Sequence, residues 1–386
     1  MIGAMKLEIT FPPATDGDIA VINLESSRQH SWSRFWHAPQ RPGIAEYIVE
    51  QEQLTVQFLG DLDGLARLDT LASQLTRVDN ESIRTALINA QVASVAHRFA
   101  EARDYLAQAE IQGAPPEATN RLSLSVDQAC GTNLEAVLEA RRLTAESGRL
   151  EDLVPLAALL ADLREFDEAE RIYCRALHEY QDVSPFAVAW VCFQLGALWG
   201  ELVAEPQSSR AELWYRKAVE YLPRYVKARV HLAEIYSATD RIGDAEAVLI
   251  PAISSGDPEV HWRLADVMDA SGRSEEAAAQ MRVARCRYRV LLEKHLLAFA
   301  DHGAEFYSGG GNNASRALEL ARVNFANRPT LRAFEQAYAI AVSAGEQHFA
   351  SEILTTAASR WRGTPGFTRS MLAAPKTMGK QRGATT

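Results

Sequence analysis

Apolar residues recur along most of the chain at helical spacing, in short segments separated by polar stretches. In one example Leu153, Leu156 and Leu160 mark a first segment, and Ala169 and Tyr173 mark the segment that follows. Residues spaced by three or four positions lie on one face of an α-helix. Each pair of segments therefore predicts two amphipathic helices joined by a short turn.

Alanine recurs at a fixed place in the second segment of these pairs. Most intervals between successive alanines are close to 34 residues, but Ala169 to Ala211 spans 42 and Ala277 to Ala317 spans 40, which indicates insertions. A lone helical hairpin cannot bury both of its apolar faces, so units with such a period stack on their neighbours. We therefore predict an all-α repeat array. The aligned alanines are Ala66, Ala102, Ala136, Ala169, Ala211, Ala245, Ala277, Ala317 and Ala350.

The repeats resemble tetratricopeptide repeats (TPRs), whose signature is Leu-Gly or Leu-Ala and a Tyr in the first helix, then Ala, an aromatic residue, Ala and Pro. The best unit spans residues 190–223 and is also similar to Sel1-like repeats. The family's Trp is missing from most units, and its Gly survives once. The resemblance covers roughly residues 44–362 and implies a right-handed α-solenoid of about nine TPR-like hairpins. The matching residues of the best unit are Leu195, Gly196, Ala211, Tyr215, Ala218 and Pro223.

The two ends of the chain depart from the repeat pattern. Residues 1–43 are expected to form an N-terminal segment or cap, in which residues 6–11 and 18–24 alternate weakly and predict a short β-hairpin. Residues 44–58, with the helix predicted after Gly60, form an atypical first hairpin. Residues 363–386 are basic and rich in Gly, Ser, Thr and Pro, and we expect them to be a disordered tail.

Charge and cysteine content restrict the function. With 40 Lys and Arg against 50 Asp and Glu, the net charge of −10 disfavours nucleic acid, which needs clustered positive charge. We expect no membrane-spanning or targeting segment, since no apolar stretch approaches the roughly 20 residues that span a bilayer and the first residues lack a basic stretch followed by an apolar run. The four cysteines are too far apart for a zinc knuckle or a disulfide framework. These features predict a cytoplasmic protein with a protein or peptide partner, no membrane and no nucleic acid.

Catalytic motifs are lacking in the sequence, so we expect no enzyme, cofactor or metal. An alternative is a metal site at Asp301, His302 and Glu305, which lie on one helical turn but lack further ligands. The glycine-rich residues 308–315 follow a helix and not a strand, which predicts a turn inside one repeat. The aromatic segment from Trp32 to Trp36 is expected to cover the open end of the array, with a recognition patch as the alternative.

The resemblance to TPRs implies that the first helix of each unit lines a concave groove. Carried onto three successive units, the groove positions hold aromatic and charged side chains that suit a peptide partner. We therefore predict a non-enzymatic scaffold or adaptor, with an accessory subunit of a partner enzyme as the alternative and the oligomeric state left open. The predicted groove residues are Trp190, Phe193, Gln194, Lys227, His231, Glu234, Trp262, Arg263 and Asp266.

Overall fold

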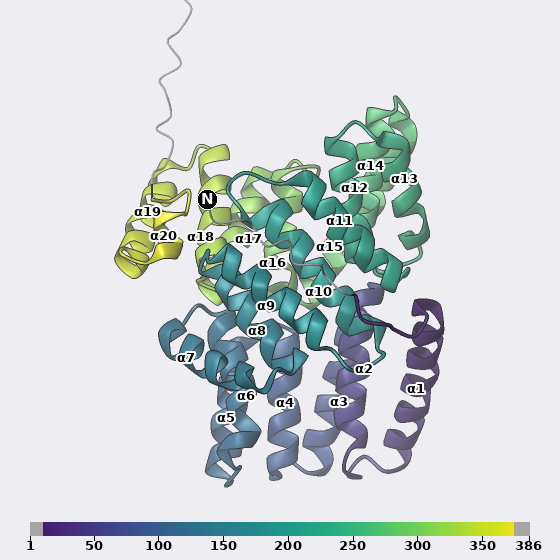
Figure 1. The fold of residues 1–386 in the computed structure, drawn as a ribbon, viewed down its shortest axis with the longest axis vertical. Helices are drawn as coiled ribbons and strands as arrows, with labels where there is room; N and C mark the ends of the chain where they lie inside the picture. Colours follow the sequence, from purple (N-terminus) through teal and green to yellow (C-terminus); the bar gives the residue numbers. More distant parts are fainter. Residues whose placement is uncertain (1–10, 374–386) are drawn as a thin grey trace, which may run out of the picture.

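The computed structural model describes residues 11–373, and in this range every regular element is helical (Figure 1). Short 3-10 turns at Ala145–Ser147 and Ile250–Ala252, and a π-helical turn at Leu198–Leu202, extend three of the helices. The helices are α1 (Gly17–His37), α2 (Ile44–Leu59), α3 (Gly64–Val78), α4 (Ile83–Val95), α5 (Phe99–Ile111), α6 (Pro116–Ala129), α7 (Leu134–Thr144), α8 (Leu150–Asp162), α9 (Phe166–Glu179), α10 (Pro185–Ala197), α11 (Ser208–Tyr221), α12 (Val226–Ala238), α13 (Ile242–Leu249), α14 (Pro258–Ala270), α15 (Ser274–Lys294), α16 (Leu296–Ser308), α17 (Ala314–Asn327), α18 (Leu331–Ser343), α19 (Gln347–Trp361) and α20 (Pro365–Thr368).

From α2 to α19 the helices pack as nine consecutive hairpins, each made of an even-numbered helix and the odd-numbered helix that follows it. This arrangement confirms the predicted α-solenoid. All nine aligned alanines lie in the second helix of a hairpin, and seven of them are buried. Ala66 and Ala136 are exposed instead, because α3 and α7 bury neighbouring residues such as Leu65 and Val137. The expected register is therefore wrong in the first and third hairpins.

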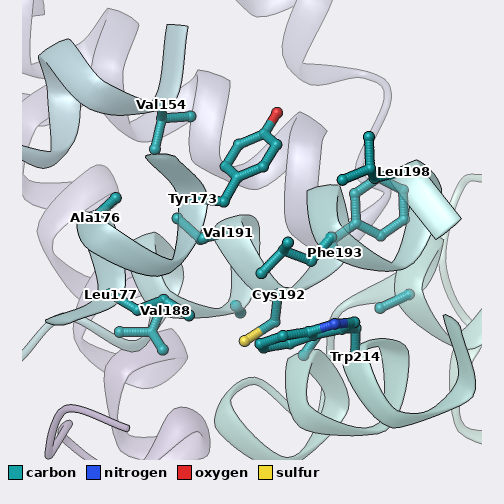
Figure 2. Packing of buried hydrophobic residues seen from close by; sticks show 14 of the residues in the cluster. Val154, Tyr173, Ala176, Leu177, Val188, Val191, Cys192, Phe193, Leu198 and Trp214 are labelled. Atoms are coloured by element: carbon teal, nitrogen blue, oxygen red, sulfur yellow. The ribbon is translucent and has the colours of Figure 1, made fainter. Parts of the chain in front are cut away.

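The fifth hairpin, α10–α11, shows why the repeat needs small residues. Gly196 of α10 lies against the ring of Tyr215 in α11, and a Cβ atom there would approach the ring to 2.5 Å. Ala211 is fully buried, one turn earlier in α11. The two helices therefore approach closely, and larger residues fill the space around them. Figure 2 shows this core, in which the sulfur of Cys192 lies beside the indole of Trp214.

Contrary to the expectation from the sequence, the window Pro185–Leu202 is long and apolar enough to cross a membrane by length and composition alone. It consists of α10 and the π-helical turn, and 67% of it is buried inside the array. Its apolar character therefore matches its place in the middle of the core.

The N-terminal segment is helical where a strand was expected. Residues 18–24 belong to α1, whose first turn is capped by Asp16 through hydrogen bonds from the backbone N–H groups of Asp18 and Ile19. The β-hairpin prediction is therefore wrong for this arm, and residues 6–10 lie outside the described residues. A weakly alternating pattern becomes helical here because α1 packs along α2.

Helix α1 packs against α2 of the first hairpin. Phe35 is fully buried against Ile48 and Leu71, and the indole of Trp32 donates a hydrogen bond of 2.7 Å to Glu52. Trp36 remains 52% exposed and stacks on Trp32. Two of the three aromatic residues therefore pack on the array, and the third faces solvent.

The residues after α19 are ordered in part. Residues 365–368 form α20, and both Phe367 and Leu372 are buried against the last hairpins. The expected disordered tail is therefore wrong up to residue 373, and the residues beyond it lie outside the described range.

The array turns back on itself, so that late hairpins lie beside early ones (Figure 1). Asn327 of α17 donates to the carbonyl of His97 at 3.0 Å, and Arg360 of α19 donates to the carbonyl of Gly131 at 2.7 Å. Gly256 donates to the carbonyl of Gly60 at 2.8 Å. In each case a turn inside an early hairpin contacts a later part of the array, which is a helix for His97 and Gly131 and the connection between α13 and α14 for Gly60.

Candidate functional site on the inner face

The predicted groove residues lie on α10, α12 and α14, the first helices of three successive hairpins, but the aromatic ones are not exposed anchors. Phe193 is 8% exposed and Trp262 is 5% exposed, while Trp190 is half-buried against Phe58 and Phe193. The prediction that Phe193 and Trp262 line an open groove is therefore wrong.

Packing between neighbouring hairpins explains the burial of Trp262. Its ring meets Phe306 of α16 edge-on at 5.4 Å, and its indole fits against the turn of Gly309 and Gly310. A Cβ on Gly310 would lie 2.6 Å from the indole nitrogen. The glycine-rich turn therefore provides the space for this tryptophan, through a contact between neighbouring hairpins that the repeat pattern does not reveal. As predicted, the turn joins the two helices of one hairpin.

The polar residues of the same set do converge. His231 and Glu234 of α12 lie one turn apart, with His231 Nδ1 at 3.1 Å from a Glu234 carboxylate oxygen. Arg263 of α14 forms an ion pair with the other oxygen of Glu234. Together with the partners described below, these residues form the inner-face network, defined as Glu201, Tyr215, His231, Glu234, Glu259, Arg263, Asp266, Glu305 and Arg332.

Glu201 joins the network from the π-helical turn after α10. It accepts a hydrogen bond of 2.7 Å from Tyr215, lies 3.0 Å from His231 Nδ1, and pairs with Arg332 of α18 at 3.2 Å. The extra residue per turn of a π-helix redirects side chains and often occurs at functional sites. The sequence analysis missed Glu201, although the long interval between Ala169 and Ala211 marked an insertion in this hairpin.

Arg263 is surrounded by four carboxylates from three helices. Besides Glu234, it lies 3.2 Å from Glu259, 3.8 Å from Asp266 and 3.4 Å from Glu305 of α16. Its guanidinium carbon also lies 3.8 Å from the centre of the Trp262 ring. Arg263 shares Glu234 with His231 but is the one cationic partner of Glu259, Asp266 and Glu305 among the described ion pairs, so carboxylates outnumber cationic groups in this part of the inner face.

The pKa shifts of the network follow from this crowding. Burial disfavours charge on His231, but Glu201 and Glu234 outweigh it and raise the pKa of His231 well above its ordinary value. Burial alone would raise the pKa of Glu201, and His231 and Arg332 instead hold that pKa far below its usual range. For Glu259 and Asp266, desolvation prevails and their pKa values are raised. The network therefore holds charged pairs together with carboxylates that lack a full counter-charge.

The remaining predicted residues take separate places. Gln194 donates weakly to the Tyr173 hydroxyl at 3.4 Å, and Lys227 is half-buried without an ion pair among the described residues. Asp301 pairs with Arg328 at 3.3 Å, while Glu305 faces Arg263. Asp301, His302 and Glu305 thus do not converge, and no group of three potential ligands fits a metal within residues 11–373.

The stacked helix pairs, the small residues between them and the Leu-Gly pair in α10 define a TPR-like helical-repeat protein. No protein-family model and no curated protein matches the chain. The crystal structure of the APC/C hetero-tetramer Cut9–Hcn1 is similar, with 12% identity over 87% of this chain and a TM-score of 0.41. The human IFIT1 dimer with m7Gppp-AAAA is also similar, with 12% identity over 87% of this chain, 68% of the other chain and a TM-score of 0.34. The chain spans only 64% of the length of the matched Cut9–Hcn1 chain. Both likenesses concern the fold alone.

Proposed function

We propose that the protein is a non-enzymatic scaffold that holds a positively charged segment of a partner protein against the inner-face network. The observation that supports this proposal is the position of Arg263 among four carboxylates. The side chains of Asp266 and Glu305 are about half exposed, so a partner can reach them. A Lys or Arg side chain would supply the missing counter-charge, and complementary charge sets the specificity and rate of association.

The chemistry of the proposed partner differs from the sequence prediction. Exposed aromatic anchors were expected, whereas the accessible side chains of this face are charged. A partner bound mainly through charge binds less tightly as salt rises, because exposed charges are screened beyond about 8 Å at physiological ionic strength.

An adaptor and an accessory subunit would both bind a partner in this way, but an accessory subunit would in addition change the turnover of a partner enzyme. A cytoplasmic location stays a prediction from the sequence.

Binding of a labelled Lys/Arg-rich peptide, measured by fluorescence anisotropy, tests the proposal. We expect Glu305→Gln and Asp266→Asn each to weaken binding by roughly threefold to tenfold, which corresponds to about 0.7–1.4 kcal/mol. Glu319→Gln is the matched control, because Glu319 is an exposed carboxylate of α17 that pairs locally with Arg316. Unchanged affinity in both inner-face variants would contradict the proposal.

Nucleic acid is the second arm of the same experiment. The comparisons do not support its exclusion, since one similar structure contains m7Gppp-AAAA. The excess of carboxylates on the inner face nevertheless favours a cationic partner over a polyanion. An RNA partner at this face would be favoured if an oligonucleotide displaced the basic peptide and bound the Arg332→Gln variant less tightly than the wild type.

A further inference from the structure

A second charged site lies away from the inner-face network, between the seventh and eighth hairpins. An open cavity of about 600 Å³ lies between one face of α15 and the glycine-rich turn that joins α16 to α17. Its walls hold three arginines, Arg282, Arg285 and Arg289, all of which are exposed. They recur three and four residues apart, so they lie on one face of α15.

These arginines have no acidic partner among the described residues. None of them has a carboxylate oxygen within 4.0 Å, and Arg285 makes only a long hydrogen bond of 3.4 Å to the carbonyl of Gly311. Arg273, at the start of the same helix, pairs with both Glu246 and Glu276. In a chain with a net charge of −10, three adjacent unpaired guanidinium groups form a local reversal of charge.

The opposite wall adds neutral hydrogen-bond donors from side chains alone, because the backbone N–H groups of Gly311, Asn312 and Asn313 already donate to carbonyls of the same turn and helix. It consists of Tyr307, Gly311, Asn312 and Asn313. The side-chain oxygen of Asn313 caps α17 by accepting from the backbone N–H of Arg316, so α17 begins at this wall. The start of a helix favours negative charge, because its first N–H groups have no partner within the helix. The arginines of α15 and Asn313, the residue that caps α17, thus line the same open space.

We propose that this cavity binds a phosphate group. Guanidinium groups bind phosphate oxygens in a bidentate manner, and clustered arginines are the usual means of recognising a phosphorylated group. By the helical rise of about 1.5 Å per residue, Arg282 and Arg289 lie roughly 10 Å apart along the axis, so the site fits one or two phosphates and not a long polyanion. The phosphate would be carried by a phosphorylated side chain of a partner protein or by a free phosphorylated small molecule.

Cys286 provides a built-in reporter for this site. It lines the cavity between the arginines and is the one exposed cysteine, since Cys130, Cys174 and Cys192 are buried. The rate of Cys286 alkylation by iodoacetamide would be measured against rising inorganic phosphate, phenyl phosphate and pyrophosphate, with sodium chloride at matched ionic strength as the reference. We expect saturable protection by the phosphates. Equal rates in phosphate and chloride would overturn the proposal.

Variants and labelled peptides identify the source of the phosphate. The double variant Arg282→Gln/Arg289→Gln should weaken phosphate protection at least tenfold, while Arg34→Gln, an exposed arginine of α1, should leave it unchanged. Tighter binding of phosphoserine peptides than of their unphosphorylated forms would indicate a protein source, and protection by phenyl phosphate without peptide binding would indicate a small molecule. The proposal would be overturned if phosphate did not protect Cys286 in the wild type and an oligonucleotide bound the wild type and the double variant equally well. Because the site shares no residue with the inner-face network, failure here leaves the proposed function standing.

Discussion

At the scale of single residues, burial separates positions that look alike in the sequence. Ala211 and Ala136 occupy the same place in the repeat alignment, but Ala211 is fully buried beside α10 while Ala136 is exposed on α7. A Cβ on Gly200 would already lie 3.1 Å from the Ala211 methyl group, so no space is left for a larger side chain. Only the buried member of the pair constrains residue size.

The first prediction compares these two alanines. Ala211→Leu should lower the free energy of unfolding by about 1–3 kcal/mol, because overpacking displaces the neighbouring helix. Ala136→Leu should change it by less than about 0.5 kcal/mol, as is usual for exposed positions. Urea denaturation of both variants checks this, and equal losses would mean that the register of α7 is wrong.

The second prediction concerns His231 and pH. The folded pKa of His231 is raised, so its ion pairs stabilise the fold below the unfolded value of about 6.5 and are lost as pH rises through the raised pKa. The pKa of Glu201 and that of Glu234 are lowered, so their contribution is lost as pH falls below the ordinary value of about 4.5. His231→Gln should therefore lower the melting temperature most between about pH 4.5 and 6.5.

The difference between wild type and His231→Gln should decline as pH rises further, since neutral His231 no longer attracts Glu201 and Glu234. Thermal melts from pH 4 to 10 measure this difference. Arg273→Gln is the control, because arginine does not titrate in that range. A difference for His231→Gln that stays constant across the whole range would show that its role is packing alone.

At the scale of the element, the turn inside each hairpin sets the geometry of the repeat. Eight of the nine turns within hairpins contain a residue with positive φ, and this residue is Gly in only some of them. Arg164 and Asp240, for example, hold φ of 64° and 60°. A left-handed residue ends the first helix and lets the chain reverse direction within a few residues. The exception is the fifth hairpin, in which the π-helical turn and an insertion replace it.

A matched pair of glycines tests this requirement. Gly272 lies in the turn between α14 and α15 and has a φ of 75°, whereas Gly243 lies inside α13. A Cβ atom added at either glycine would have no neighbouring atom within 4 Å. Gly272→Ala should destabilise the protein by about 1–2 kcal/mol through backbone strain alone. Gly243→Ala should stabilise it by about 0.5–1 kcal/mol, since alanine favours the helix.

Thermal melts of the two glycine variants show directly whether each substitution raises or lowers the stability of the fold. Stabilisation by Gly272→Ala would contradict a left-handed residue in this turn.

At the scale of the whole molecule, contacts between hairpins that are distant in sequence hold the array turned back on itself. Arg164, in the turn between α8 and α9, forms an ion pair with Glu335 of α18, and Glu335 also accepts a hydrogen bond of 2.7 Å from Ser370. Arg332 crosses from α18 to Glu201. In a solenoid held only by neighbouring repeats, these groups would not meet.

Removing one of these links should open the superhelix. Glu335→Ala leaves Arg164 without its carboxylate in a place where both side chains are largely buried, so we expect a larger radius of gyration in small-angle X-ray scattering. Glu319→Ala removes a carboxylate that pairs within α17 and should leave the radius unchanged. Identical scattering from both variants would mean that the contacts between neighbouring hairpins alone set the curvature.

The sequence by itself determined the helical class, the number of hairpins and most positions of the small residues. These features depend on local periodicity, because each hairpin repeats the same contacts with its neighbour. The tertiary structure alone decided that residues 18–24 join a helix, that Trp262 and Phe193 are buried, and that Glu201 and Arg332 meet. A helical pattern shows which residues share a face of a helix, but it does not show which neighbouring helix covers that face. The ion pair of Glu201 with Arg332 joins residues that meet only because the array turns back on itself.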